Sequence, residues 1–227
     1  MFKAIIIYGP PGGGKGTQSE LLVKKHNLVN FDTGSYIESV VHDPKNKNSK
    51  EIQAERKLFD TGILNTPSWV LGVVKDSVGR IADAGFGVVL SGSPRTLYEA
   101  FGDDKTEGLL EFLEKKFGKK NMIIIELVLP EKHSVVRNST RLLCSLCRLS
   151  VLGVSYKNAK VCPFCGSKLF KRTLDKADVI QQRLEQYRMR TQPIFKEMKK
   201  RGIKIIKVNA APMPAKVFES ISRLVKK

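Results

Sequence analysis

The sequence predicts an α/β fold in which a parallel sheet carries helices on both faces. Four short runs of mostly apolar residues recur along the chain, and segments with helical pattern or length separate them. Parallel strands need such crossovers, and strands covered on both faces are apolar throughout. The four expected strands are Lys3–Tyr8, Gly87–Leu90, Met122–Leu129 and Ile203–Val208.

Composition fits a folded domain with a sizeable core. The chain has 227 residues, of which 41% are hydrophobic, so disorder, collagen and coiled coil are excluded. Its 40 Lys and Arg against 22 Asp and Glu give a formal charge of +18, which favours anionic ligands such as nucleotides or nucleic acid. No apolar run approaches the roughly 18 residues that span a membrane. We therefore expect a cytoplasmic protein with no membrane partner.

A glycine-rich segment joins the first strand to the first expected helix, Gly16–Lys25. It reads Gly9-Pro-Pro-Gly-Gly-Gly-Lys-Gly-Thr17, and its order of strand, GxxxxGK and helix is that of a P-loop. Glycines let backbone N–H groups converge on a phosphate, and the lysine reaches the β and γ phosphates. A plain helix-capping turn is the less favoured alternative. The expected phosphate-binding residues are Gly12, Gly13, Gly14, Lys15, Gly16 and Thr17.

Two segments interrupt the alternation of strands and helices. The first, residues 33–78, has a helical pattern and is called here the helical insertion. The second, residues 141–173, holds all four cysteines and is called the cysteine insertion. Both look like insertions into one core, which would then consist of residues 1–32, 79–140 and 174–227.

The cysteines form two CxxC pairs. Cys144 and Cys147 make the first pair, and Cys162 and Cys165 follow fourteen residues later. This spacing is typical of a tetrahedral thiolate site for Zn²⁺, whereas four buried reduced cysteines would not require paired spacing. With four protein ligands the metal has no open position, so we expect a structural zinc that folds a small β-rich flap.

The motifs together resemble those of adenylate kinases and their nucleoside monophosphate kinase relatives. The loop GPPGGGKGTQ carries the family's Gly-Thr-Gln after the lysine, and Asp32-Thr33-Gly34 resembles its Ser-Thr-Gly. The segment GVVLSGSPRTLYEA, from Gly87 to Ala100, resembles the family's Pro-Arg-Thr region. Four further arginines match family spacing: Arg137, Arg141, Arg172 and Arg183.

The resemblance implies a P-loop NTPase-like core, a helical monophosphate-binding insertion and a zinc-binding lid. It implies phosphoryl transfer from ATP to a nucleoside monophosphate with Mg²⁺, by a chain that is a monomer. It assigns the catalytic clamp to Lys15, Arg95, Arg141, Arg172 and Arg183. Arg137 would pack on the adenine of ATP, with Arg141 also on the ATP side. The acceptor site would be formed by Thr33, Gly34, Gly92, Arg95, Glu99, Arg172 and Arg183.

Four positions depart from the family pattern. Glu38 replaces an arginine that grips the acceptor phosphate, and Ser91 replaces an aspartate that holds water on Mg²⁺. Leu174 precedes Asp175 where the family usually has two aspartates. Glu99 replaces the glutamine that reads adenine. An ionised carboxylate could accept from adenine N6, cytosine N4 or guanine N1 and N2, so altered acceptor specificity is a hypothesis, with AMP as the first expectation.

Two functions of different class remain at this point. The favoured one is an ATP:nucleoside monophosphate phosphotransferase, because the phosphate loop and five clamp cations are kept. The alternative is a nucleotide-binding regulatory or RNA-associated protein with little turnover, which the four departures and the charge of +18 would suit.

Overall fold

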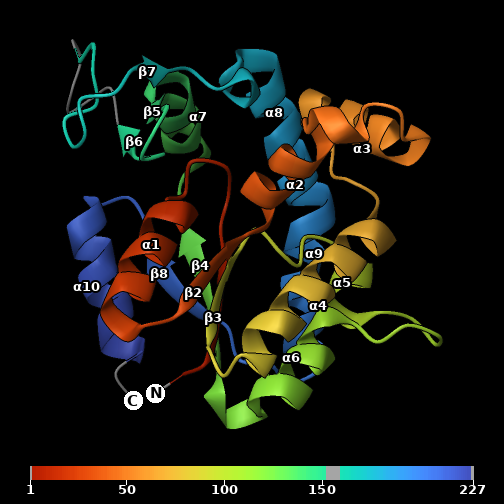
Figure 1. Cartoon of the computed structure of the whole chain (residues 1–227). Coiled ribbons are helices and arrows are strands. Elements are labelled where there is room, and N and C mark those ends of the chain that lie inside the picture. Colours follow the sequence, from red (N-terminus) through yellow and green to blue (C-terminus); the bar gives the residue numbers. More distant parts are fainter. Residues whose placement is uncertain (1, 152–158, 226–227) are drawn as a thin grey trace.

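The fold is built on a five-stranded sheet in which every neighbouring pair of strands is parallel. The computed structural model describes residues 2–151 and 159–225. The strand order is β2-β3-β1-β4-β8, with β1 at the centre (Figure 1). The strand bounds are β1 Ala4–Tyr8, β2 Val29–Asp32, β3 Val88–Ser91, β4 Met122–Val128 and β8 Ile206–Asn209. The predicted parallel sheet is confirmed, and it gains one strand, β2, that the sequence analysis did not anticipate.

Helices cover both faces of this sheet (Figure 1). The helices of the core are α1 Lys15–His26, α4 Pro67–Asp83, α5 Leu97–Phe101, α6 Leu109–Phe117, α7 Glu131–Thr140, α8 Ala177–Gln186, α9 Gln192–Lys200 and α10 Pro214–Val225. A five-residue π-helical turn, η4 Tyr187–Thr191, joins α8 to α9, and a short turn, η2 Lys119–Asn121, precedes β4.

Alternate residues of the central strand enter two separate cores. Ala4 and Ile6 pack into a cluster with residues of α4, α6 and α9. Ile5 and Ile7 pack on the other face with residues of α1 and α10. Because successive side chains of a strand point to opposite faces, a strand buried on both sides must be apolar throughout, as β1 is.

The helical insertion contains α2 Thr33–Val41, η1 Pro44–Asn46 and α3 Lys50–Thr61. Its expected end at residue 78 falls inside α4. Four residues of α4 are buried in the same cluster as β1, so this helix packs as a layer of the core: Val70, Leu71, Val74 and Val78.

The cysteine insertion folds as a separate three-stranded antiparallel sheet, ordered β6-β5-β7. Its strands are β5 Leu142–Cys144, β6 Ser150–Val151 and β7 Leu169–Phe170, and the turn η3 Thr173–Asp175 leads from it into α8. The β-rich flap predicted from the cysteine spacing is thus confirmed in the described part; residues 152–158 lie outside the described residues.

The carboxyl ends of the strands meet at one edge, between the two insertions (Figure 1). In open parallel sheets ligands bind at this edge. Among the described residues, no helix is both long enough and apolar enough to cross a membrane.

Candidate active site

The glycine-rich loop follows β1 at the carboxyl edge and ends at the amino terminus of α1. Gly12 and Gly14 have positive φ, at 74° and 86°, a region that residues with a Cβ rarely occupy. A Cβ on Gly12 would lie 2.6 Å from Nδ2 of Asn138, so no larger residue fits. Lys15 Nζ donates to the carbonyl oxygens of Gly9 at 2.8 Å and Pro10 at 3.0 Å, which holds the ammonium group at the loop.

Helix α7 packs against the glycine-rich loop and is hydrogen-bonded to it. Ser134 and Asn138 are fully buried, and the Ser134 hydroxyl donates to the carbonyl of Pro11. Asn138 Nδ2 in turn donates to the carbonyl of Ser134 at 2.8 Å. The sequence analysis did not identify these two supporting residues, because the contact that joins them to the loop, from Ser134 to Pro11, spans 123 positions.

Lys15 and the arginines expected in the clamp lie within electrostatic range of one another. Burial, followed by the charges of Arg95 and Arg183, lowers the pKa of Lys15 well below its usual value. Burial and then the charges of Arg141, Arg172 and Arg95 lower the pKa of Arg183 to about 9. Groups far apart could not exert these effects. The structure therefore brings together all five cations that the sequence placed in one site.

Asp175 is the buried carboxylate that holds part of this cation cluster. Its side chain is inaccessible to solvent and accepts from Arg141 Nε at 2.6 Å and Arg141 Nη2 at 2.8 Å. Arg183 Nη1 lies 3.6 Å from the same carboxylate and donates to the carbonyl of Leu174 at 3.2 Å. Asp175, in η3, thus organises two arginines, and Leu174 contributes through its backbone.

Arg95 is fixed by the turn that follows β3. Its Nε donates to the carbonyl of Gly92 at 2.6 Å, and a Cβ on Gly92 would lie 2.9 Å from Arg95 Nη2. Thr191, in η4, donates from its hydroxyl to the Arg95 carbonyl at 3.0 Å. Gly34 approaches the same guanidinium group, since a Cβ there would lie 3.8 Å from Nη2.

Several buried hydroxyl groups near the carboxyl edge find no hydrogen-bond partner among residues 2–151 and 159–225. They belong to Thr33, Ser91 and Ser93. Thr33 begins α2, Ser91 ends β3, and Ser93 lies two residues after Ser91. Buried polar groups in folded proteins usually have a partner, so these hydroxyls suit a polar ligand at the strand ends.

Glu99 is buried and faces its own turn. Its Oε2 accepts from the Arg95 backbone N–H at 2.9 Å, and its Oε1 accepts from the Thr96 hydroxyl at 3.0 Å. Burial raises the pKa of Glu99 to about 6, although these two hydrogen bonds act in the opposite direction. Glu99 therefore stabilises the turn that presents Arg95, a role that the sequence analysis did not consider.

Arg137 lies beside the loop that follows β8. Its guanidinium group donates to the carbonyl oxygens of Ala210 and Ala211, both at 2.9 Å. The expected adenine-packing arginine is therefore anchored to this loop.

Glu38, which stands where the family has an arginine that grips the acceptor phosphate, pairs with two arginines. Its Oε2 accepts from Arg172 Nη2 at 3.0 Å and from Arg148 Nη2 at 3.4 Å. Arg172 follows β7, and Arg148 lies between β5 and β6. The helical insertion is thereby linked to the cysteine insertion by one carboxylate.

The four cysteine sulfurs converge on one point. All lie within 4.8 Å of one another, with Cys144 and Cys165 sulfurs 3.3 Å apart and Cys147 and Cys162 sulfurs 3.6 Å apart. Zinc–sulfur bonds of about 2.3 Å in a tetrahedron require sulfurs about 3.8 Å apart, so the donor set fits that metal. A backbone hydrogen bond from Ser167 and the neighbouring thiols lower the pKa of Cys165 to about 6, which favours a thiolate.

Comparison with known proteins decides the family. The family model described as adenylate kinase matches residues 7–203. The adenylate kinase of Methanosarcina acetivorans is 31% identical over 226 residues and that of Methanothrix thermoacetophila 32% over 227, each covering 98% of both chains. That of Clostridium tetani is 30% identical over 223 residues, covering 97% of both. The chain belongs to the adenylate kinase family.

This membership confirms the resemblance drawn from the sequence, including the fold, and makes the chain a nucleoside monophosphate kinase. The four-cysteine cluster places it with the adenylate kinases that have a zinc-type lid.

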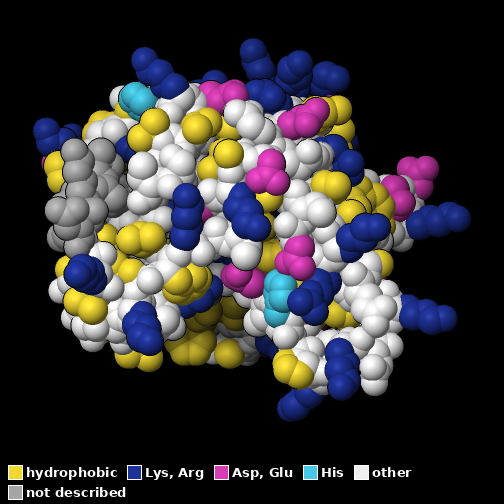
Figure 2. All heavy atoms as spheres, turned by 90° about the horizontal axis from the view of Figure 1, so that it is seen from above, with side chains coloured by type: hydrophobic (Ala, Val, Ile, Leu, Met, Phe, Trp, Pro, Cys, Tyr) yellow, Lys and Arg dark blue, Asp and Glu magenta, His cyan; other side chains and the backbone are white. Residues whose placement is uncertain are grey.

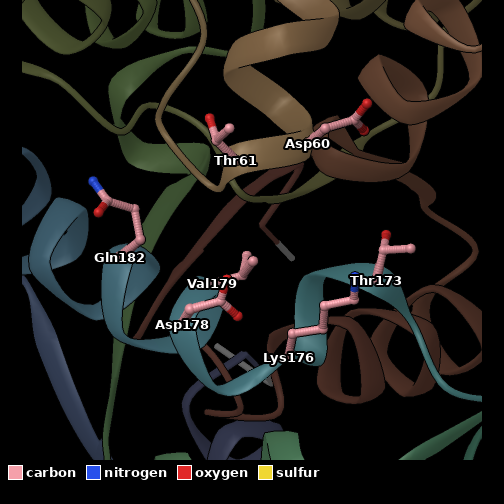
Figure 3. Close-up of a pocket in the computed structure, with 7 residues that line it drawn as sticks. All are labelled: Asp60, Thr61, Thr173, Lys176, Asp178, Val179 and Gln182. Atoms are coloured by element: carbon pink, nitrogen blue, oxygen red, sulfur yellow. The ribbon is translucent and has the colours of Figure 1, made fainter.

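A separate pocket of about 310 Å³ lies between the end of α3 and the start of α8 (Figure 3). Asp60 and Thr61 face Thr173 and Lys176 across it. None of its lining residues belongs to the cation cluster. Beside it, Gly62 packs closely on α8, since a Cβ there would lie 2.9 Å from Val179.

Replacing Asp175 tests the buried anion. Asp175→Asn leaves Arg141 and Arg183 without their counter-charge, so we expect the free energy of unfolding to fall by about 3 kcal/mol in urea titrations. The matched control is Asp178→Asn, an exposed carboxylate in the first turn of α8, which should cost under about 1 kcal/mol. Equal losses in the two variants would contradict the role given to Asp175.

Replacing Glu99 tests the raised pKa. Between pH 4.5 and about 6 the folded state binds more protons at Glu99 than the unfolded state does, so this carboxyl lowers stability as pH rises through that window. From pH 4.5 to pH 7 the free energy of unfolding of the parent protein should fall by about 2 kcal/mol because of Glu99, and Glu99→Gln should not show this fall. Urea unfolding at several pH values measures it. The exposed Glu185→Gln serves as control and should leave the profile unchanged.

Proposed function

We propose that the protein transfers the γ-phosphoryl group of ATP to AMP, which yields two ADP. The observation that carries this proposal is the convergence of Lys15, Arg95, Arg141, Arg172 and Arg183 at the loop, where burial and then the neighbouring arginine charges lower the pKa of Lys15, Arg95 and Arg183. Such a cluster favours a ligand with several negative charges. Two nucleotides aligned through their phosphates supply that charge.

The reaction needs no general base. An oxygen of the AMP phosphate, already deprotonated at pH 7, forms the new bond to the γ phosphorus, while the bond from that phosphorus to the bridging oxygen of ATP breaks. Charge spreads over the transferring group, and preorganised cations stabilise it without moving. In the proposed roles Lys15 contacts the β and γ phosphates, Arg95 orients the acceptor phosphate, and Arg141, Arg172 and Arg183 surround the transferring group.

The residues present also suit Mg²⁺, which would neutralise charge between the β and γ phosphates. Thr17 follows the loop, and Ser91 presents a buried hydroxyl with no partner among the described residues. Ser91 supplies an uncharged oxygen where the family has aspartate, so it would hold a metal-bound water by hydrogen bonding alone.

We further propose AMP as the acceptor rather than another monophosphate. Both oxygens of Glu99 accept hydrogen bonds from its own turn, so its carboxylate serves to hold Arg95 and does not select a base by itself. Thr33, Gly34 and Gly92 would border the AMP phosphate and sugar. Arg137, fixed against Ala210 and Ala211, would offer its flat face to the adenine of ATP.

We infer that the cysteine cluster holds a structural Zn²⁺ in the cysteine insertion. Two- and three-residue strands have almost no core of their own, so the metal would supply folding energy. The monomeric state and cytoplasmic location expected from the resemblance belong to the same proposal.

Substitution of the clamp tests the activity. Lys15→Ala and Arg95→Ala should each lower kcat/KM for ADP formation from ATP and AMP by at least about a hundredfold, because each removes a charge that positions one of the two reacting nucleotides. Lys24→Ala, exposed in the last turn of α1, and Arg80→Ala, exposed on α4, are matched controls. The same coupled assay with GMP, CMP and UMP should give lower rates than AMP. No ADP from any of the four acceptors would refute the proposal.

Metal analysis tests the zinc site. We expect one zinc per chain, and removal with a strong chelator should lower the melting temperature, which added Zn²⁺ restores. Cys162→Ser should lose the metal, while Ser145→Ala, exposed between the first two cysteines, should keep it. A protein that holds no zinc yet melts at the same temperature with and without chelator would contradict this inference.

A further inference from the structure

Glu38 forms an ion pair that spans the two insertions. The carboxylate stands on α2, and both of its partners belong to the cysteine insertion: Arg172 at 3.0 Å and Arg148 at 3.4 Å. Arg172 is the better buried of the two, with 16% of its side chain exposed against 51% for Arg148. The Glu38–Arg172 pair is therefore the stronger contact, because it is less screened by water.

Arg172 is at the same time a member of the cation cluster. Its charge lowers the pKa of both Arg95 and Arg183, so it lies within electrostatic range of them. Its buried Nε finds no hydrogen-bond partner among the described residues. A guanidinium group with one nitrogen on Glu38 and another without a partner can accept a second anion, or exchange the first for it.

A nucleotide phosphate and Glu38 cannot both satisfy Arg172 without cost. If both anions contacted the same guanidinium group, they would repel each other. Glu38 is the anion that can leave, because its carboxylate is partly exposed and water can solvate it. Arg148 offers Glu38 a second partner nearby.

We propose that Glu38 is a positioning residue that occupies Arg172 in the nucleotide-free enzyme and yields it to the substrate phosphates. The inference rests on the proposed function for the identity of those phosphates. Glu38 thus holds α2 and the cysteine insertion in place before substrates arrive, and its competition for Arg172 weakens their binding. It sets KM rather than the rate of transfer, because it does not contact the reacting atoms.

The test measures ligand affinity and the kinetic constants of Glu38→Gln. Removing the competing charge should tighten binding of inorganic tripolyphosphate, followed by calorimetry, by about threefold to tenfold. KM for ATP and AMP should fall by a similar factor, with kcat changed less than about twofold. A contact that served only to tie the insertions together would give the opposite sign, because its loss would loosen the site and weaken binding.

Matched variants isolate the pair from the general charge of the protein. Glu51→Gln removes the same charge from the exposed first turn of α3 and should change tripolyphosphate affinity less than twofold. In an Arg148→Gln background, Glu38→Gln should keep its full effect, because Arg172 remains. Glu38→Ser provides a second variant if the glutamine protein folds poorly, and thermal melting checks both.

The outcomes separate this inference from the proposed function. Unchanged or weaker tripolyphosphate binding by both Glu38 variants, with normal ADP formation by the parent protein, would overturn the role of Glu38 alone. Tighter binding together with no ADP formation by the parent protein would support Glu38 and refute the proposed reaction.

Discussion

Repulsion among like charges is the constraint on which the rest of the site depends. Burial, followed by the charges of neighbouring arginines, lowers the pKa of Lys15, Arg95 and Arg183 at the carboxyl edge. Within the described chain, Glu99, Asp32 and Asp175 are the carboxylates whose charges act in the opposite direction on this cluster. Keeping an excess of cations in one place therefore lowers the free energy of unfolding, and binding of a polyphosphate ligand would raise it again.

The fold meets this constraint with elements whose directions are set by the sheet. Parallel strands bring the phosphate loop, Asp32 and the Arg95 turn to one edge, although Gly9 and Arg95 are 86 positions apart in the sequence. The two insertions rise from that edge (Figure 1); the cysteine insertion adds Arg141 and Arg172, and α8 adds Arg183. Figure 2 looks down on this side, where Lys and Arg side chains outnumber acidic ones across the surface. The excess charge of the chain is thus displayed around the site as well as within it, which would draw anionic nucleotides toward it.

The sequence predicted those features whose signal is local. The apolar strands, the glycine-rich loop and the paired cysteines each lie within a few consecutive residues, and the structure contains all of them. Strand β2, Val29–Asp32, escaped prediction because it has four residues of mixed polarity. Contacts between distant positions could not be read from spacing: Arg141 and Asp175 are 34 residues apart, and Glu38 and Arg172 are 134 apart. Glu99 was expected to read the base because it stands where the family has its adenine-reading glutamine. Its burial and its hydrogen bonds to Arg95 and Thr96 could not be read from the sequence, because they are properties of the folded turn.

Asp175 and Glu38 show two different uses of a carboxylate among crowded cations. Asp175 has no exposed side-chain surface and holds Arg141 through two short hydrogen bonds, so releasing it would leave a desolvated charge at a cost of several kcal/mol, on the order of 3 to 5. Glu38 is 28% exposed and makes one bond to each arginine, an arrangement worth about 1 kcal/mol or less. A binding phosphate can easily offset the loss of the Glu38 contacts, but it could offset the loss of the Asp175 contacts only by losing much of its own affinity. Asp175 is therefore a permanent anion and Glu38 an exchangeable one, which lets the cysteine insertion change partners at Arg172 while Arg141, where it begins, stays bound to Asp175.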